Sequence, residues 1–317
     1  MTARQMALFV CLVIQLVTPA TGASSKVVRA NARVPASRDE RTHVQHRTEV
    51  PVPEIKKWGC RSMRAHFVVI NDTHVGPDDM RGLDGAMLRL KNQKPDFIVF
   101  TGDLTRGQGE SESTKRASFK TLLEAARKAE RPFYLGMGNT DMVLDASGDP
   151  TRVFRESTGT APYYSFESGG VHFVMLYTEG PKPSRVGTVS DQQLRWLQAD
   201  LQAMGHGMPV VLLGHHPLYP DESKWEQDNW SIDNARQLFE VLEPYHLIAT
   251  FCSHRHLNRM SLDARGVLHV INGSMVGDHS DDVGPKKDGI GYRWVVMTPD
   301  KISTTWIRIG VSDIPKR

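Results

Sequence analysis

Residues 66–74, His-Phe-Val-Val-Ile-Asn-Asp-Thr-His, pass from a short apolar run directly into a polar cluster. The run from His66 to Ile70 is too short for a typical helix and is rich in β-branched residues, so it predicts a buried strand. The cluster Asp72-Thr73-His74 begins where this strand leaves the sheet. Open α/β folds place their functional sites at that point, which makes the cluster a candidate site.

The same pattern recurs four times along the chain, each time as a predicted strand followed by a polar motif. The segments between these strands are amphipathic, which predicts an α/β domain built on packed sheets. The further strand-and-motif pairs are Phe97–Phe100 with Gly102-Asp103, Phe133–Leu135 with Gly138-Asn139-Thr140-Asp141, Val210–Leu213 with Gly214-His215-His216-Pro217, and Leu247–Phe251 with Ser253-His254-Arg255-His256.

The intervening segments carry their own helix and strand signals. Ser190 and Gln193 have the spacing of a capping box, and an apolar stripe at helical spacing follows them. A turn at Ser168-Gly169-Gly170 joins two runs that predict a hairpin. The predicted elements are a helix with Leu194, Leu197 and Leu201 on one face, a helix with Ala235, Leu238, Phe239 and Leu242 on one face, a hairpin over Tyr163–Phe166 and Val171–Tyr177, and strands over Val267–Ile271, Tyr292–Met297 and Ile302–Ile309.

The polar residues at the five strand ends have the chemistry of metal ligands. Each motif alone has a simpler interpretation, because a strand-ending Asp is commonly a turn or cap residue and a Gly-Asn pair a turn. Together, in chain order, they present Asp, His, Asp, Asn, His, His and His. Carboxylate, amide and imidazole ligands suit zinc, iron or manganese, and the near absence of thiols argues against a structural zinc cage. The sequence therefore predicts a hydrated, catalytic metal site.

The five motifs resemble those of the calcineurin-like metallophosphoesterases, whose pattern runs Asp-x-His, Gly-Asp, Gly-Asn-His-Asp or Glu, a His after a strand, and Gly-His-x-His. The resemblance extends from Ala65 to about Ile309, and the motif style is similar to the cyclic-nucleotide phosphodiesterase branch. It implies a four-layer α/β/β/α sandwich, in which two mixed β-sheets are flanked by helices. It also implies metal-dependent hydrolysis of a phosphomonoester or phosphodiester.

The resemblance further implies two divalent metal ions, which can be iron, manganese or zinc. Two such ions about 3.5–4 Å apart can clamp a phosphoryl group and turn a bridging water into hydroxide near neutral pH. Carried over residue by residue, it assigns Asp72, His74 and His256 to one ion, Asn139, His215 and His254 to the other, and Asp103 to both.

Thr140 departs from the family pattern at the position of the usual catalytic His. An alcohol has no pKa near working pH, so Thr140 cannot act as the general acid, and no catalytic acid is assigned. His216 can donate a proton in its place or can be a structural imidazole before Pro217. Arg255 can bind a phosphate oxygen alongside Asn139, or it can be simply solvated. Ser253, where the family has Gly, changes only the backbone freedom before His254.

Two rival functions remain open, along with weaker site candidates. The first rival is a binding protein that keeps the metals with little turnover, which Thr140 favours. The second is a nuclease or phospholipid-processing phosphodiesterase on the same fold. The segment Gly102–Arg106 lacks a nearby tyrosine, so a purple metal centre is not expected. The weaker candidates are Trp225 and Trp230 as a substrate rim or as packing residues, and Asp278, Asp281 and Asp282 near His279 as a further ion site or a solvated loop.

The N-terminal segment has the layout of a secretory signal peptide. Arg4 precedes an apolar run from Ala7 to Val17, and small residues follow up to Ala23. A retained anchor or a buried helix is the alternative, but the run is shorter than the roughly 20 residues that span a bilayer. We therefore expect export to the periplasm or medium. The predicted organisation is a signal peptide over 1–23, a polar linker or arm over 24–60, the catalytic domain over 61–310 and a tail over 311–317.

The composition fits a globular protein with a sizeable core. The 317 residues are 39% hydrophobic and 24% charged, with a net charge of +3 that forms no dense basic block, so the charge indicates no dedicated nucleic-acid binding and names no partner. The family resemblance implies a small phosphate-ester substrate. No transmembrane anchor is expected after signal removal, and the oligomeric state stays open. After loss of Cys11 with the signal, Cys60 and Cys252 either form one disulfide or leave Cys252 as a buried strand thiol.

Overall fold

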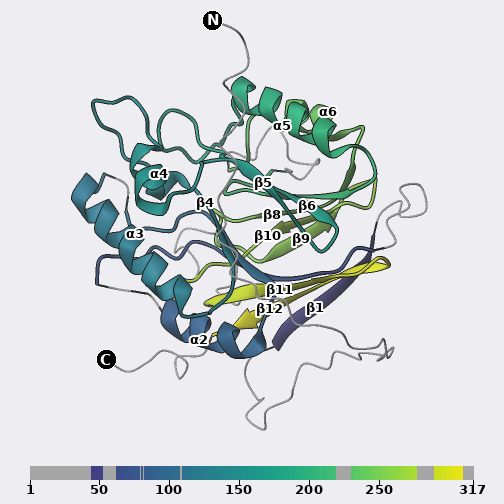
Figure 1. Ribbon diagram of the computed structural model, residues 1–317, viewed down its shortest axis with the longest axis horizontal. Helices are drawn as coiled ribbons and strands as arrows, with labels where there is room; N and C mark the ends of the chain where they lie inside the picture. Colours follow the sequence, from purple (N-terminus) through teal and green to yellow (C-terminus); the bar gives the residue numbers. More distant parts are fainter. Residues whose placement is uncertain are drawn as a thin grey trace, which may run out of the picture. The chain divides into compact units, whose positions relative to one another are not determined.

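Two six-stranded β-sheets form the frame of the domain (Figure 1). The computed structural model describes residues 44–52, 62–218 apart from 79, 81 and 108, 230–276 and 289–309, all of which belong to one compact unit. The first sheet has the order β1-β12-β11-β2-β3-β4 and the second β5-β6-β7-β8-β10-β9. Both are mixed, because β2, β3 and β4 run parallel in the first, as do β6, β7, β8 and β10 in the second, while antiparallel strands complete each sheet.

The strand bounds agree closely with the predicted apolar runs, except that β1 and β9 were not predicted. In the first sheet they are β1 Val44–Pro51, β2 Ala65–Ile70, β3 Phe97–Thr101, β4 Phe133–Gly136, β11 Gly291–Met297 and β12 Lys301–Arg308. In the second sheet they are β5 Tyr164–Ser168, β6 Val171–Met175, β7 Pro209–Leu213, β8 His246–Cys252, β9 Arg259–Leu262 and β10 Leu268–Ile271. The predicted hairpin is confirmed as the antiparallel pair β5–β6.

Strand alternation sorts the core into separate layers. In β2, Phe67 faces the other sheet, where its ring centroid lies 5.3 Å from that of Phe173 and 5.7 Å from that of Phe251. Val68 and Ile70 point the other way, into a cluster with the helices of the first layer. Because successive side chains of a strand alternate between its faces, each central strand contributes to two cores.

Helices cover the outer face of each sheet and complete the predicted four-layer α/β/β/α sandwich (Figure 1). The first sheet is covered by α2 (Leu83–Gln93), α3 (Glu112–Arg127) and α4 (Arg152–Thr158). The second is covered by α5 (Asp191–Met204) and α6 (Ala235–Leu242), which bury Leu197, Leu201, Leu238 and Leu242 against it. The amphipathic helices predicted at 190–201 and 235–242 are therefore confirmed.

The capping box predicted at Ser190 is only half formed. The Ser190 hydroxyl accepts from the Gln193 backbone N–H at 3.2 Å and caps α5. The Gln193 side chain does not return to the cap, because it is fully used elsewhere: its Oε1 accepts from the Tyr177 N–H at 2.9 Å and its Nε2 donates to the Tyr177 carbonyl at 2.6 Å. Gln193 thus joins the start of α5 to the chain leaving β6.

The segment 24–60 was predicted to be a polar linker or arm, and of these alternatives a linker is wrong for Val44–Pro51, which forms β1. This strand pairs antiparallel with β12 and covers the edge that β12 would otherwise expose. Val50 and Val52 are buried, while Glu49 accepts from Lys301 Nζ at 3.0 Å and Ser303 Oγ at 3.1 Å. The segment resembled a linker because an edge strand tolerates charged residues and a terminal proline.

Several predictions fall on residues outside the described part of the chain. Among the described residues, no helix is long and apolar enough to span a membrane. The segments and residues that lie outside the description are the predicted signal peptide 1–23, the tail 311–317, Cys11, Cys60, Trp225, Asp278, His279, Asp281 and Asp282.

Candidate metal centre

The five polar motifs meet because the strands that precede them end at one edge of each sheet. Backbone hydrogen bonds continue the strand pairing into the loops. In the first sheet the Asp72 N–H donates to the Gly102 carbonyl and the His74 N–H to the Asp103 carbonyl, both at 3.1 Å. In the second sheet the Ser253 N–H donates to the His215 carbonyl at 2.9 Å. Parallel strands thus deliver distant motifs to one place.

The side chains of these motifs form two groups with the spacing of metal sites. In each group, one ligand atom from every residue lies within 4.8 Å of the others; the first group is Asp72, His74 and His256, and the second is Asp103, His215 and His254. Asn139 joins the second group, since its Oδ1 lies 3.1 Å from His215 Nε2. The structure therefore brings all seven predicted ligands together, in the two predicted sets.

Asp103 faces both groups. Its Oδ1 lies 3.3 Å from His215 Nε2 in the second group, and its Oδ2 lies 3.8 Å from His74 Nε2 in the first. One carboxylate that directs an oxygen to each side is suited to link two ions and to set their separation.

Several polar atoms of the two groups lack hydrogen-bond partners among the described residues and are suited to bind cations. Asp72 Oδ1 and His74 Nε2 are buried and have no hydrogen-bond partner in the described part of the chain. In the second group, His215 Nε2 lies 3.1 Å from both His254 Nδ1 and Asn139 Oδ1. Buried polar atoms without partners are costly, and lone pairs that converge repel one another. A divalent ion in each group would satisfy these atoms.

Charge and burial hold two ligands in the protonation state that metal binding requires. Burial alone raises the pKa of Asp72, but the facing His256 imidazole, together with His215 and His74, outweighs it and holds that pKa well below its ordinary value. Burial, together with the nearby His215 and His216 rings, lowers the pKa of His254 far below the ordinary imidazole value. Asp72 is therefore ionised and His254 neutral, which are the metal-binding forms of the two side chains.

The ligand loops adopt an uncommon backbone conformation. Five of the seven predicted ligands have positive φ: Asp72 at 48°, His74 at 42°, Asp103 at 48°, His254 at 71° and His256 at 50°. For residues with a Cβ this left-handed conformation costs roughly 1–2 kcal/mol each, and it persists where the surrounding structure enforces it. Such strain gathers at functional sites, in agreement with the ligand assignment.

Two motif glycines are required by close backbone approach. A Cβ on Gly138 would lie 2.3 Å from the Asp103 backbone nitrogen, and one on Gly102 would lie 2.8 Å from His215 Nδ1. Any other residue at these positions would push the Asp103 and His215 loops apart. The Gly-Asp and Gly-Asn motifs thus have a steric reason for their glycines.

Asp141 connects the loop after β3 to the loop after β4. Its buried carboxylate accepts from the backbone N–H groups of Gly138 at 2.9 Å, Leu104 at 3.1 Å and Thr105 at 2.9 Å, and from the Thr105 hydroxyl at 2.9 Å. Burial and the nearby Asp103 carboxylate raise the pKa of Asp141, while these donors and the Lys115 ammonium oppose that shift.

Lys115 anchors the same loop from helix α3. Its fully buried Nζ donates to Thr105 Oγ1 at 3.1 Å and to the carbonyls of Arg106 and Gly107 at 2.6 Å each. Glu110 Oε2 lies 3.2 Å away and supplies the opposite charge. The ammonium group has three donors, and all are used. The sequence interpretation missed Lys115, although its spacing to Ser118, Phe119 and Leu122 places it on the buried face of α3.

Thr140 contributes to the geometry of Asp103. Its backbone N–H donates to Asp103 Oδ1 at 2.9 Å, and its hydroxyl donates to the Thr105 carbonyl at 2.8 Å. Both polar groups of Thr140 therefore hold the ligand loops in place.

His216 is enclosed beside the second group. Its Nδ1 lies 3.1 Å from both Thr178 Oγ1 and Glu179 Oε1, its Nε2 lies 3.2 Å from the Ser184 carbonyl, and the residue is fully buried. Its ring centroid is 4.2 Å from that of His254. With both ring nitrogens engaged, His216 is suited to support His254, and this favours the structural interpretation over proton donation.

Cys252 is a buried thiol at the end of β8. It is a free cysteine, and burial raises its pKa to about 12. Cys252 belongs to neither ligand group, so both groups are free of sulfur. The predicted alternative partner, Cys60, lies outside the described residues.

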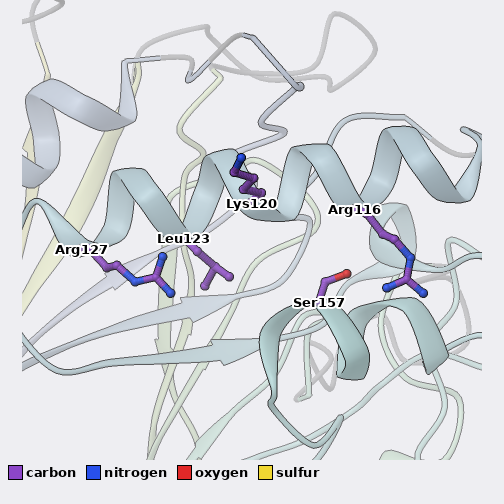
Figure 2. A pocket seen from close by; sticks show the side chains of 5 residues that line it. All are labelled: Arg116, Lys120, Leu123, Arg127 and Ser157. Carbon is purple, nitrogen blue, oxygen red and sulfur yellow. The ribbon is translucent and has the colours of Figure 1, made fainter.

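A separate cavity of about 350 Å³ lies between α3 and α4, away from the metal ligands (Figure 2). It is lined by Arg116, Lys120, Leu123, Arg127 and Ser157. Arg116 is already paired with Glu112 and Glu156. None of the predicted ligands lines this cavity, so it is not the site of the metal chemistry.

Comparison with known proteins agrees with this arrangement. The family model for calcineurin-like phosphoesterases matches residues 65–258. The chain is 25% identical over 211 residues to a probable glycerophosphodiester phosphodiesterase of Arcobacter nitrofigilis, a match that covers 60% of this chain and 71% of the relative. It is 26% identical over 216 residues to a 3′,5′-cyclic adenosine monophosphate phosphodiesterase of Escherichia coli K12, covering 64% and 73%.

A solved structure shows the same fold. A dimetal phosphatase from Danio rerio superposes with a TM-score of 0.61 at 16% identity, over 77% of this chain and 96% of that one. At this identity the likeness concerns the fold alone.

The position of Asp103 predicts that Asp103→Asn lowers the metal content of the protein. The loss should be larger than that caused by changing any buried carboxylate outside the two ligand groups. The purified protein should hold two divalent ions, and the variant should lose at least one, because an amide is a weaker ligand to both. Inductively coupled plasma mass spectrometry after dialysis measures this. Asp263→Asn, which alters a buried carboxylate paired with His269, is the control. Two ions retained by Asp103→Asn would contradict the linking role.

The contacts of Lys115 predict that Lys115→Met destabilises the fold by about 3 kcal/mol, because Glu110 loses its opposite charge and Thr105 Oγ1 and two carbonyls lose their buried donor. Denaturant unfolding measures the loss, and metal affinity should fall in parallel. Lys120→Met on the same helix is the matched control, since that side chain is 78% exposed and its surface pair contributes about 0–1 kcal/mol. Equal stability of the two variants would exclude an anchoring role for Lys115.

Proposed function

The chain belongs to the calcineurin-like phosphoesterase family, and from this premise we propose that it is a hydrolase of small phosphodiesters. The convergence of seven ligands into two groups that share Asp103 is the observation that carries the proposal. Dimetal sites of this kind serve phosphoryl transfer. The two relatives named as phosphodiesterases support diesters over monoesters as the substrate class.

In the proposed mechanism Asp72, His74 and His256 would hold one divalent ion, and Asn139, His215 and His254 would hold the other, with Asp103 available to both. When bound, the ions would supply Lewis-acid charge for the activation of water. We propose iron, manganese or zinc, which suit this mixture of oxygen and nitrogen ligands. The Asn139 amide and the Arg255 guanidinium then orient the phosphoryl oxygens, since Arg binds such oxygens bidentately.

Among the described residues, the proposed site lacks an evident proton donor for the leaving group. Thr140 has no acidic proton near neutral pH, and its hydroxyl is already donated to the Thr105 carbonyl. Both nitrogens of His216 are engaged. The chain should therefore depend on leaving groups that depart without much protonation.

The second candidate function is a binding protein that retains both ions with little turnover. The Thr140 position favours it, because a positioned general acid contributes about 10²–10⁴ in rate. A protein of this kind would bind phosphodiesters with the same ligand set and would release them unchanged.

For location, we propose that the protein is exported and that residues 1–23 are removed. The motive is the charged, apolar and small-residue order from Arg4 to Ala23. One outcome of export concerns Cys60, which would then be in an oxidising compartment, where a thiol is readily oxidised.

Hydrolysis of p-nitrophenyl, phenyl and alkyl phosphodiesters tests the enzymatic function. We expect kcat/KM to fall steeply as the leaving-group pKa rises, because the site lacks a proton donor, and Thr140→His to flatten that slope. Thr140→Ser, which keeps the hydroxyl, is the control and should keep the steep slope. A flat dependence in the natural protein would mean that another group supplies the proton. Metal-loaded protein that turns over none of these esters would favour the binding function.

N-terminal sequencing of protein recovered outside the cytoplasm tests the location. The mature chain should begin near Ser24, because cleavage is expected after Ala23. An intact Met1 on protein recovered from the cytoplasm would contradict export.

A further inference from the structure

Three loops converge on the outer side of His254. Its Nδ1 faces the second metal group, 3.1 Å from His215 Nε2, while its Nε2 lies 3.2 Å from the Arg185 carbonyl. The ring centroid of Trp230 is 5.3 Å from that of His254. Since the two imidazole nitrogens point to different sides of the ring, the chain around Arg185 lies on the side away from the metal group. Trp230 comes from the loop before α6, and Arg255 follows His254 directly.

Two guanidinium groups flank the indole of Trp230. The Arg185 Cζ lies 5.0 Å from the Trp230 ring centroid, and the Arg255 Cζ lies 6.0 Å from it. Both distances are within the range of cation–π attraction, which offsets part of the repulsion between the two like charges. Arg185 is exposed to solvent.

We propose that Arg185, Trp230 and Arg255 form a subsite that binds a second anionic group, a carboxylate or a phosphate, on the part of the substrate that is not cleaved. The inference rests on the proposed phosphodiesterase function and adds the class of diester that the site prefers. Arg255, between two predicted ligands, is close enough in sequence to serve the reacting phosphoryl group. Arg185, on the far side of His254, is placed to serve the attached substituent.

Guanidinium chemistry favours an anion over an aromatic group in this subsite. Arg presents a planar fork of donors that matches the oxygens of a carboxylate or phosphate. The indole already has two cations near its ring, so it serves to orient the arginines. An anion would be attracted by both guanidinium groups, whereas a neutral ring would compete with them for the indole.

Three p-nitrophenyl phosphodiesters test the subsite, because they share one leaving group and differ only in the second substituent: ethyl, 2-carboxyethyl and 2-phenylethyl. For the natural protein at fixed ionic strength, we expect kcat/KM to be about tenfold higher for the carboxyethyl than for the ethyl ester, as for one charge-assisted hydrogen bond. Arg185→Gln should reduce this ratio to near one. The ratio is the readout because a general loss of activity cancels from it.

Lys182→Gln is the matched control, since it removes one positive charge from an exposed position on the same loop. It should leave the ratio and the ethyl-ester activity unchanged. A ratio near one in the natural protein, an equal fall in both variants, or a preference for the phenylethyl ester would each overturn the proposal.

The same esters separate this inference from the proposed function. If none is hydrolysed, the phosphodiesterase proposal fails, and isothermal titration calorimetry with the metal-loaded protein then tests the subsite by itself. Tighter binding of the carboxyethyl ester that is lost in Arg185→Gln would support the subsite. Equal affinities for the ethyl and carboxyethyl esters would overturn it.

Discussion

The metal centre depends on one buried carboxylate that binds no metal in the proposed scheme, that of Asp141. Its four hydrogen bonds connect Gly138, Leu104 and Thr105, so they set the distance between the loop of Asp103 and the loop of Asn139. Lys115 donates a hydrogen bond to Thr105 and places a compensating positive charge near the Asp141 carboxylate. Asp141 and Lys115, which are not predicted ligands, would therefore help to set the separation of the two ions.

Contacts between the ligand loops also maintain the left-handed backbone conformation at five of the predicted ligands. A strained loop relaxes unless its neighbours hold it, and here the neighbours are other ligand loops. The Asp72 and His74 N–H groups donate to carbonyls of the Gly102-Asp103 motif, and Gly138 leaves room for the Asp103 backbone to approach. These contacts thereby hold the ligand side chains toward one another.

The sequence predicted that the motif side chains would meet, because their positions follow from the strand topology. A buried strand ending in a polar motif must deliver that motif to the sheet edge, so the sites at Asp72 and His254 could be inferred from apolar runs 66–70 and 247–251. The supporting contacts could not. Lys115 and Gln193 look like ordinary helix residues, and their partners, Thr105 and Tyr177, are defined only once the helices pack. The edge strand Val44–Pro51 was also missed. An edge strand pairs with a neighbour on one side only, so its sequence can stay polar and resemble a linker.

The division of ligands between the two sheets couples ion binding to the architecture. Asp72 and His74 follow a strand of the first sheet and His256 a strand of the second, and Asp103 and His215 are divided in the same way. Neither sheet alone carries a complete set for either ion. Each ion would therefore link the two sheets, and its binding free energy would stabilise their packing against each other. The free energy of unfolding of the domain would therefore rise with the concentration of free metal ion.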